Sequence, residues 1–293
     1  MKVAVIANPS KSLGGGLLEL RRVLEQHGVE EPIWHEVPKS RKAPAAVERA
    51  LAKGAELVFA WGGDGLVQRC IDTLAGTDVP LAIVPAGTTN LLATNLKIPA
   101  DIEAAVAIGL DGERRRIDVG RMNGERFGVI AGAGIAAAMS RDADGNLKDK
   151  LGRVAYIWAA LRNLRTEPFG AKVKVDGVTW FDGEATCILV ANLGELFGDI
   201  EVFANSQPND GMLEVGVVTA DGLAQWTRTT ARTLLTNATE SPFVQATQAR
   251  SVDITMSRKV VYELDGGDRK KTRKLKVKVE PAAVTLCVLR SAS

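Results

Sequence analysis

The sequence predicts an α/β domain with a parallel sheet over the first 118 residues and an all-β domain after it. Short, continuous apolar runs alternate with helical patterns in the first half, whereas strand patterns dominate after Ile117-Asp118. Strands that are apolar along their whole length are typical of a parallel sheet covered on both faces. The chain has 293 residues, which is enough for two hydrophobic cores.

The strands and helices of the first half follow in regular alternation. The predicted strands are three apolar runs, at residues 3–7, 57–61 and 81–84. The predicted helices show apolar residues at helical spacing, at residues 17–27, 44–53 and 66–74. Pro44 suits a first helical turn, and Asp101 is placed to cap one more helix that ends near Ile108.

The second half contains a series of short strand patterns. We expect strands at residues 127–130, 171–175, 185–191, 213–218, 251–256, 260–264 and 275–279. Turns are expected at three Asp-Gly pairs, Asp176-Gly177, Asp182-Gly183 and Asp210-Gly211. A helix is predicted at residues 151–164. This pattern favours an antiparallel sandwich or an open barrel.

Composition excludes several classes of function. The formal charge of +2 is too small to indicate a nucleic-acid partner. Cys70, Cys187 and Cys287 are widely spaced, which argues against a zinc site or a disulfide framework and favours a reducing cytoplasm. No apolar run approaches the ~20 residues of a membrane span, so we expect no transmembrane segment. Contact with a membrane surface stays open.

Polar or glycine-rich turns follow the predicted strands of the first half. These turns are Asn8-Pro9, Gly62-Gly63-Asp64-Gly65 and Pro85-Ala86-Gly87-Thr88-Thr89-Asn90. In an open parallel sheet, ligands bind beyond the carboxyl ends of the strands. Glycines let the backbone approach a phosphate, and the helix that follows adds its positive end. The alternative for residues 62–65 is a tight strand-to-helix turn capped by Asp64.

Two side-chain features sharpen this prediction. A carboxylate inside an anion cradle would repel bare phosphate, so Asp64 suggests a magnesium ion between itself and a nucleotide. Thr88 and Asn90 can hydrogen-bond phosphate or ribose oxygens, or cap the helix that follows. Two such turns at one sheet edge predict a nucleotide-phosphate site.

The motifs, in this order, resemble those of the diacylglycerol kinase catalytic family. That family includes bacterial diacylglycerol kinases, YegS-type lipid kinases, and sphingosine and ceramide kinases. Besides the turns above, the matching segments are Ile117-Asp118-Val119-Gly120, Gly152-Arg153-Val154-Ala155-Tyr156, Asn209-Asp210-Gly211-Met212-Leu213 and Leu264-Asp265-Gly266. The resemblance covers nearly the whole chain.

The resemblance implies an ATP- and Mg²⁺-dependent kinase that phosphorylates a hydroxyl of a diacylglycerol-like or sphingoid lipid. It implies a three-layer α/β domain at residues 1–118, rejoined by residues 282–293, and a β-sandwich for the lipid at residues 119–281. The implied nucleotide-binding residues are Asn8, Gly62, Gly63, Asp64, Gly65, Thr88 and Asn90. The implied metal ligands are Asp64, the carboxylate of Asp210, and the carbonyls of Gln207 and Met212. By itself, Asp210-Gly211 is a plain hairpin turn.

Three positions depart from the family pattern. Leu66 stands where the family usually has threonine, and Val37-Pro38 stands where a threonine pair is expected. Gly267 replaces the glutamate that serves the family as its general base. A positioned general base typically raises the reaction rate by roughly 10²–10⁴-fold. Asp265 or Asp268 could substitute. A catalytically weak or silent lipid- or nucleotide-binding protein is therefore a second hypothesis.

The third hypothesis is an NAD kinase, which shares the glycine loop. That family usually carries an Asn-Glu pair after the second motif, where this chain has Asn90-Leu91.

A basic segment bears on the membrane question. Residues 269–278 hold seven basic residues in ten. They predict either a patch for an anionic membrane or a solvated strand face, because Leu275, Val277 and Val279 alternate with lysines. We expect a cytoplasmic protein that meets its lipid substrate peripherally at a membrane. The identity of the lipid and the oligomeric state, including a homodimer, stay open.

Overall fold

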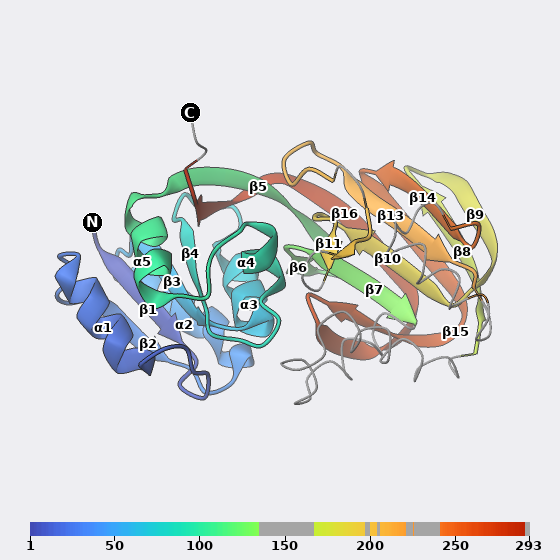
Figure 1. Cartoon of the computed structure of the whole chain (residues 1–293). Helices are drawn as coiled ribbons and strands as arrows, with labels where there is room; N and C mark the ends of the chain where they lie inside the picture. Colours follow the sequence, from blue (N-terminus) through green and yellow to red (C-terminus); the bar gives the residue numbers. More distant parts are fainter. Residues whose placement is uncertain (135–166, 197–199, 204–205, 221–224, 226–240, 291–293) are drawn as a thin grey trace. The chain divides into compact units, whose positions relative to one another are not determined.

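The computed structural model describes residues 1–134, 167–196, 200–203, 206–220, 225 and 241–290. The chain divides into two compact units, one of Met1–Ile117 with Ala282–Ser293 and the other of Asp118–Pro281 (Figure 1). The predicted helix at residues 151–164 and the motif at residues 152–156 lie outside the described residues.

The first unit contains a parallel sheet in the strand order β2-β1-β3-β4. Its strands are β1 (Val3–Ala7), β2 (Ile33–Glu36), β3 (Leu57–Gly62) and β4 (Leu81–Pro85). Every residue of β1, β3 and β4 is buried, as the continuous apolar runs predict. The far end of the long strand β16 (Gly267–Val288) lies parallel to β4, with Leu286 opposite Leu81.

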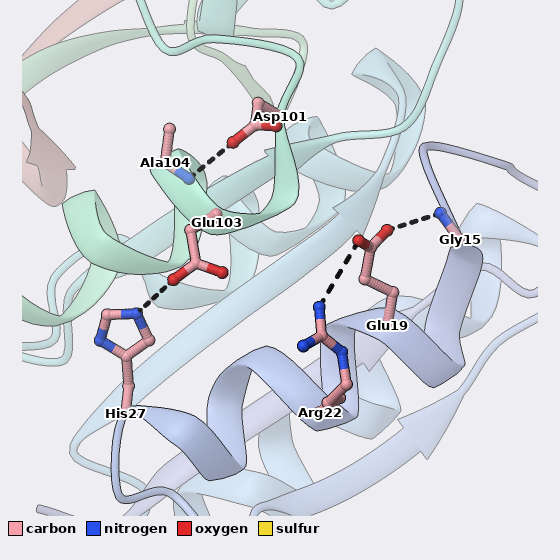
Figure 2. Close-up of polar contacts among 7 residues, drawn as sticks. All are labelled: Gly15, Glu19, Arg22, His27, Asp101, Glu103 and Ala104. Atoms are coloured by element: carbon pink, nitrogen blue, oxygen red, sulfur yellow. Dashed lines mark hydrogen bonds and ion pairs between the residues drawn. The ribbon is translucent and has the colours of Figure 1, made fainter.

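Helices in this unit pack in pairs, α1 with α5 and α2 with α3. The bounds are α1 (Gly16–Gln26), η1 (Ser40–Lys42), α2 (Ala43–Ala52), α3 (Asp64–Leu74), α4 (Leu91–Asn95) and α5 (Ile102–Asp111). The predicted cap of α5 is confirmed, because the carboxylate of Asp101 accepts the amide of Ala104 at 2.8 Å (Figure 2). Figure 2 also shows His27 at the end of α1 contacting Glu103 of α5 at 3.0 Å.

The second unit is the β-sandwich that the sequence predicts. Its main ladder is antiparallel and runs β14-β13-β10-β7-β15-β16, with β8 pairing β15 and β9, and β5 pairing β16 and β6. The bounds are β5 (Glu113–Met122), β6 (Glu125–Phe127), β7 (Ile130–Gly134), β8 (Phe169–Val175), β9 (Val178–Ala185), β10 (Cys187–Ala191), β13 (Leu213–Val218), β14 (Val244–Ala249) and β15 (Ser251–Leu264), with a small pair β11 (Glu195–Leu196) and β12 (Ile200–Glu201). Inward-facing side chains such as Phe127, Phe169 and Ile254 form its core.

Four predicted features of this unit are wrong. The expected strand at residues 185–191 is divided, because β9 ends at Ala185 and β10 begins at Cys187. The expected strand at residues 127–130 is split between the end of β6 and the start of β7, because the intervening amides bind a carboxylate instead of continuing the ladder. Asp182-Gly183 lies inside β9 instead of forming a turn, and Asp182 pairs with Lys172 on β8. The runs at 251–256 and 260–264 are one strand whose register shifts at a bulge.

Candidate functional site

The predicted turns of the first unit lie side by side at one edge of its sheet. The amide of Asn8 donates to the carbonyl of Trp61 at 2.9 Å, which joins the turn after β1 to the end of β3. The amide of Ala86 donates to the carbonyl of Gly62 at 3.1 Å, which joins the turn after β4 to the same place. The structure therefore brings the nucleotide-binding candidates of all three turns together.

Asp64 connects two of these turns directly. Its half-buried carboxylate accepts the amide of Asn90 at 3.0 Å and the amide of Leu91 through its other oxygen. The contact ties the first residue of α3 to the start of α4. Each carboxylate oxygen has further lone pairs, so these hydrogen bonds leave Asp64 able to contact a cation.

Most glycines of the two turns are explained by close packing. A β-carbon on Gly87 would lie 2.3 Å from the α-carbon of Gly63, and one on Gly62 would lie 2.6 Å from Leu66 Cδ2. Gly65 is different, because it is exposed and Ser40 supplies the neighbouring atoms, with Oγ 3.6 Å from a β-carbon built there. Its amide lies in the first turn of α3, where backbone amides have no acceptor within the helix, and it donates to none of the described residues.

The amide side chains of these turns serve partly to shape them. Asn90 adopts a left-handed backbone conformation (φ 52°), and its side chain bonds the amide and carbonyl of Gly87 and the carbonyl of Pro85. Asn8 Oδ1 accepts the amide and hydroxyl of Ser10. In the described part of the chain, Asn8 Nδ2 has no acceptor. Thr88 is exposed.

Leu66 and Val37, the two apolar departures from the expected threonines, are core residues. Leu66 is 2% exposed and covers Gly62, and α3 starts without a side-chain cap. Val37 is 3% exposed. The residue that sequence reasoning missed is Ser40, which lies against Gly65 within the basic run of residues 39–42. A hydroxyl among lysines and arginine just after a strand is the signal that could have found it.

Asp210 lies in a turn of the second unit that a buried aspartate holds in place. Asp118, 2% exposed, accepts the amide of Gly211 at 2.7 Å, and Asp210 accepts the amide of Met212 at 2.9 Å. The sequence motif Ile117-Asp118-Val119-Gly120 does not by itself reveal this role of Asp118. Burial raises the pKa of nearby Glu214, and the charge of Asp210 adds to that shift while a hydrogen bond from Gln248 opposes it.

The candidate metal ligands at this turn are all oxygen atoms, which suits a hard cation such as Mg²⁺. Within the described ranges, no three acidic, histidine or cysteine side chains are grouped closely enough to hold a metal ion. A magnesium ion at Asp210 would therefore need backbone carbonyls, such as those of Gln207 and Met212, and water.

Asp265 is a buried clamp in a tight hairpin. It is 4% exposed, and its carboxylate accepts three amides at the start of β7, from Gly128 at 2.7 Å and from Val129 and Ile130 at 2.9 Å. With Gly266 it forms the two-residue connection between β15 and β16, both at positive φ. Burial raises the pKa of Asp265, and the three amides and Arg269 oppose the shift.

The neighbouring positions differ from this buried clamp. Asp268 is exposed and lies opposite Glu263 in the ladder between β15 and β16. A β-carbon on Gly267 would lie 2.9 Å from Arg269 Nη1, and the Nε atom of Arg269 donates to both carboxylate oxygens of Glu125 at 3.0 Å. Arg269 therefore borders the space into which a side chain at position 267 would grow.

Comparison with known proteins identifies the family. A family model for the diacylglycerol kinase catalytic domain matches residues 2–122, and one for the YegS C-terminal NAD kinase beta sandwich-like domain matches residues 129–288. The chain belongs to the diacylglycerol kinase family. The diacylglycerol kinase of Bacillus subtilis (strain 168) is 30% identical to it over 272 residues, covering 90% of this chain and 89% of that protein.

Solved structures agree with this family membership at the level of the fold. A diacylglycerol kinase from Bacillus anthracis superimposes with a TM-score of 0.77 at 24% identity, covering 98% of this chain and 96% of that one. An NAD kinase from Archaeoglobus fulgidus in complex with ATP gives 0.55 at 12% identity, covering 98% and 93%. In the part of the chain that the structure describes, none of the helices has the length and apolar character needed to span a membrane.

Proposed function

We propose that this member of the diacylglycerol kinase family uses ATP and Mg²⁺ to phosphorylate a hydroxyl of a diacylglycerol-like or sphingoid lipid. The observation that carries the proposal is the clamp of Asp64, which joins two glycine turns beside the open amide of Gly65. We infer that the protein is cytoplasmic and meets its lipid peripherally at a membrane.

The chemistry of the first unit fits the phosphates of ATP. The amide of Gly65 and the positive end of α3, which is 11 residues long, would hold phosphate oxygens. Asn8 Nδ2 and the Thr88 hydroxyl can donate from the neighbouring turns, and the Ser40 hydroxyl can donate from beside Gly65. Asp64 would hold the magnesium ion, whose charge would offset the charge of the phosphates in the transition state.

Asp268 is the better placed of the two acids proposed as the general base. Asp265 already accepts three amides and is buried, so its oxygens are committed to the hairpin. Asp268 is exposed and could receive the proton of the acceptor hydroxyl. The hydroxyl oxygen of the lipid would then attack the γ-phosphorus, and ADP would leave. Asp265 would act through the shape of the hairpin that carries Asp268.

A second candidate function is nucleotide or lipid binding with little turnover. The absence of a side chain at Gly267, together with the commitment of Asp265 to backbone amides, favours it. The two candidates share the site in the first unit and differ only in phosphoryl transfer.

Radiolabelled ATP with Mg²⁺, offered to diacylglycerol, ceramide, sphingosine and NAD in mixed micelles, tests the proposal. We expect label in a lipid, loss of label with Asp64→Asn, and a strong reduction with Asp268→Asn. Asp111→Asn, an exposed aspartate of α5, is the matched control and should keep full turnover. Label in NADP would refute the lipid kinase, and ATP binding without any labelled product would establish the second candidate.

A further inference from the structure

Five lysines share the outer face of three adjacent strands in the second unit, and we name this the lysine face. Its members lie on β8 and β16, and they are Lys172, Lys174, Lys274, Lys276 and Lys278. On the intervening strand β15, Thr255 pairs with Lys172 and Lys274, and Asp253 pairs with Lys174 and Lys276. Residues directly opposite in an antiparallel ladder point to the same side of the sheet.

Burial confirms which side that is. Val173, Ile254 and Leu275 alternate with the outward residues and are 0%, 2% and 1% exposed in the sandwich core. All five lysines are exposed. The face is therefore an outer surface of the sheet, and its charges are fixed in rows by the ladder.

The charges on this face are poorly balanced. Lys172 pairs with Asp182 of β9 at 2.9 Å, and Asp253 lies between Lys174 and Lys276. Considering the described residues, Lys174, Lys274, Lys276 and Lys278 make no ion pair. Neighbouring lysines on one strand face are about 7 Å apart, which is within the Debye length of about 8 Å at physiological salt, whereas the rows on β8 and β16 are two strand spacings, about 10 Å, apart. Lysines at the closer spacing repel one another, and an anionic partner that covered them would relieve this repulsion.

We propose that the lysine face docks on an anionic membrane surface. The inference rests on the proposed function, in which the acceptor is a lipid, and it names the contact surface and the lipid charge. Lysine ammonium groups act as point charges and need no fixed geometry, which suits mobile phosphate headgroups. The outward residues of these rows include no aromatic side chain, which a surface for single-stranded nucleic acid normally presents.

Vesicle sedimentation of the full chain, without ATP, tests this docking. We compare phosphatidylcholine vesicles with vesicles that also contain phosphatidylserine. Each lysine near the surface contributes about fivefold in affinity, so Lys274→Gln, Lys276→Gln and Lys278→Gln together should weaken binding to the anionic vesicles about 100-fold. The control removes three exposed lysines of the first unit, Lys2→Gln, Lys53→Gln and Lys97→Gln, with the same change in net charge. It should bind nearly as the wild type does.

The result is separable from kinase activity. Turnover of lipid in uncharged detergent micelles should be the same for the triple variant and the wild type, so failure of docking and failure of catalysis give different results. Equal binding of the triple variant and the wild type to anionic vesicles would overturn the proposal, as would wild-type binding that ignores phosphatidylserine. Binding of an oligonucleotide that the triple variant loses, without vesicle binding, would assign the face to nucleic acid instead.

Discussion

Asp64 in the first unit and Asp265 in the second unit both accept backbone amides in a glycine-rich turn, but they differ in burial. Each carboxylate ties a glycine-rich turn to backbone amides of another segment, two amides for Asp64 and three for Asp265. Asp64 remains half-buried, whereas Asp265 is 4% exposed. The greater exposure of Asp64 is the reason that we propose ligand binding for this acid and a structural role for Asp265.

The largest expected effect is on the stability of the second unit. Asp265→Asn keeps one oxygen acceptor and turns an NH₂ group toward amides that need an acceptor, so we expect the free energy of unfolding to fall by about 3 kcal/mol. Urea denaturation measures this. Asp268→Asn, three residues away and exposed, should change it by less than about 0.5 kcal/mol. Equal effects of the two variants would contradict the assignment of Asp265 as the clamp.

Asp64→Asn should lower turnover strongly and the free energy of unfolding only slightly. It loses part of a two-amide contact, so we expect a stability loss of about 1 kcal/mol. Lipid phosphorylation should fall about 100-fold or more, because the proposed ligand of the magnesium ion is lost. Initial rates with saturating lipid, alongside urea denaturation, give both numbers. A variant that loses stability and turnover in equal measure would show that Asp64 is a clamp alone.

The parallel strands and their turns could be predicted from the sequence because those patterns are local. Continuous apolar runs fix the buried strands, and the turns of parallel neighbours must meet at one edge. The fold class and the family followed from motifs read in order.

The roles of individual side chains depend on contacts that the sequence does not display. The amides that occupy Asp265 come from residues 135 to 137 positions earlier in the chain. The position of Ser40 beside Gly65 depends on how η1 packs against α3. Leu66 reads as a lost hydroxyl in sequence, and the structure shows the apolar contact that it makes with Gly62 instead.

Gly267→Glu tests whether the hairpin of Asp265 can carry a stronger base. The new β-carbon would meet the end of the flexible Arg269 side chain, which can move, and Gly267 is not among the residues at positive φ. If this position limits turnover, lipid phosphorylation should rise at least about tenfold. Gly267→Gln, of the same size without the charge, should give no rise. A rate for the glutamate variant that does not exceed the wild-type rate would refute the limit.

Ser40→Ala is a smaller perturbation on the side of Asp64. Removing one hydroxyl next to Gly65 should raise the KM for ATP about fivefold, the equivalent of one hydrogen bond, with little change in stability. Ser40→Thr should restore the wild-type KM. The matched control is Ser257→Ala, which removes the hydroxyl of an exposed serine on β15 that belongs to none of the three turns. An unchanged KM for Ser40→Ala would remove this residue from the phosphate site.

The smallest expected effect concerns pH, where the two units should respond with opposite sign. Burial and the charges of Arg49 and Lys53 lower the pKa of His35 on β2 below its ordinary 6.5. The stability that neutral His35 supports is present above pH 6.5 and is lost as the pH falls through the lowered pKa. Burial raises the pKa of Asp265, so stability from its neutral form is present at low pH and is lost as the pH rises through the raised pKa.

Amide hydrogen exchange from about pH 7 to about pH 5, corrected for the intrinsic rate, should show β2 losing protection on acidification in the wild type and less so in His35→Gln, while β15 does not follow. Parallel loss in both strands, unaffected by the histidine, would show that the acid sensitivity arises elsewhere.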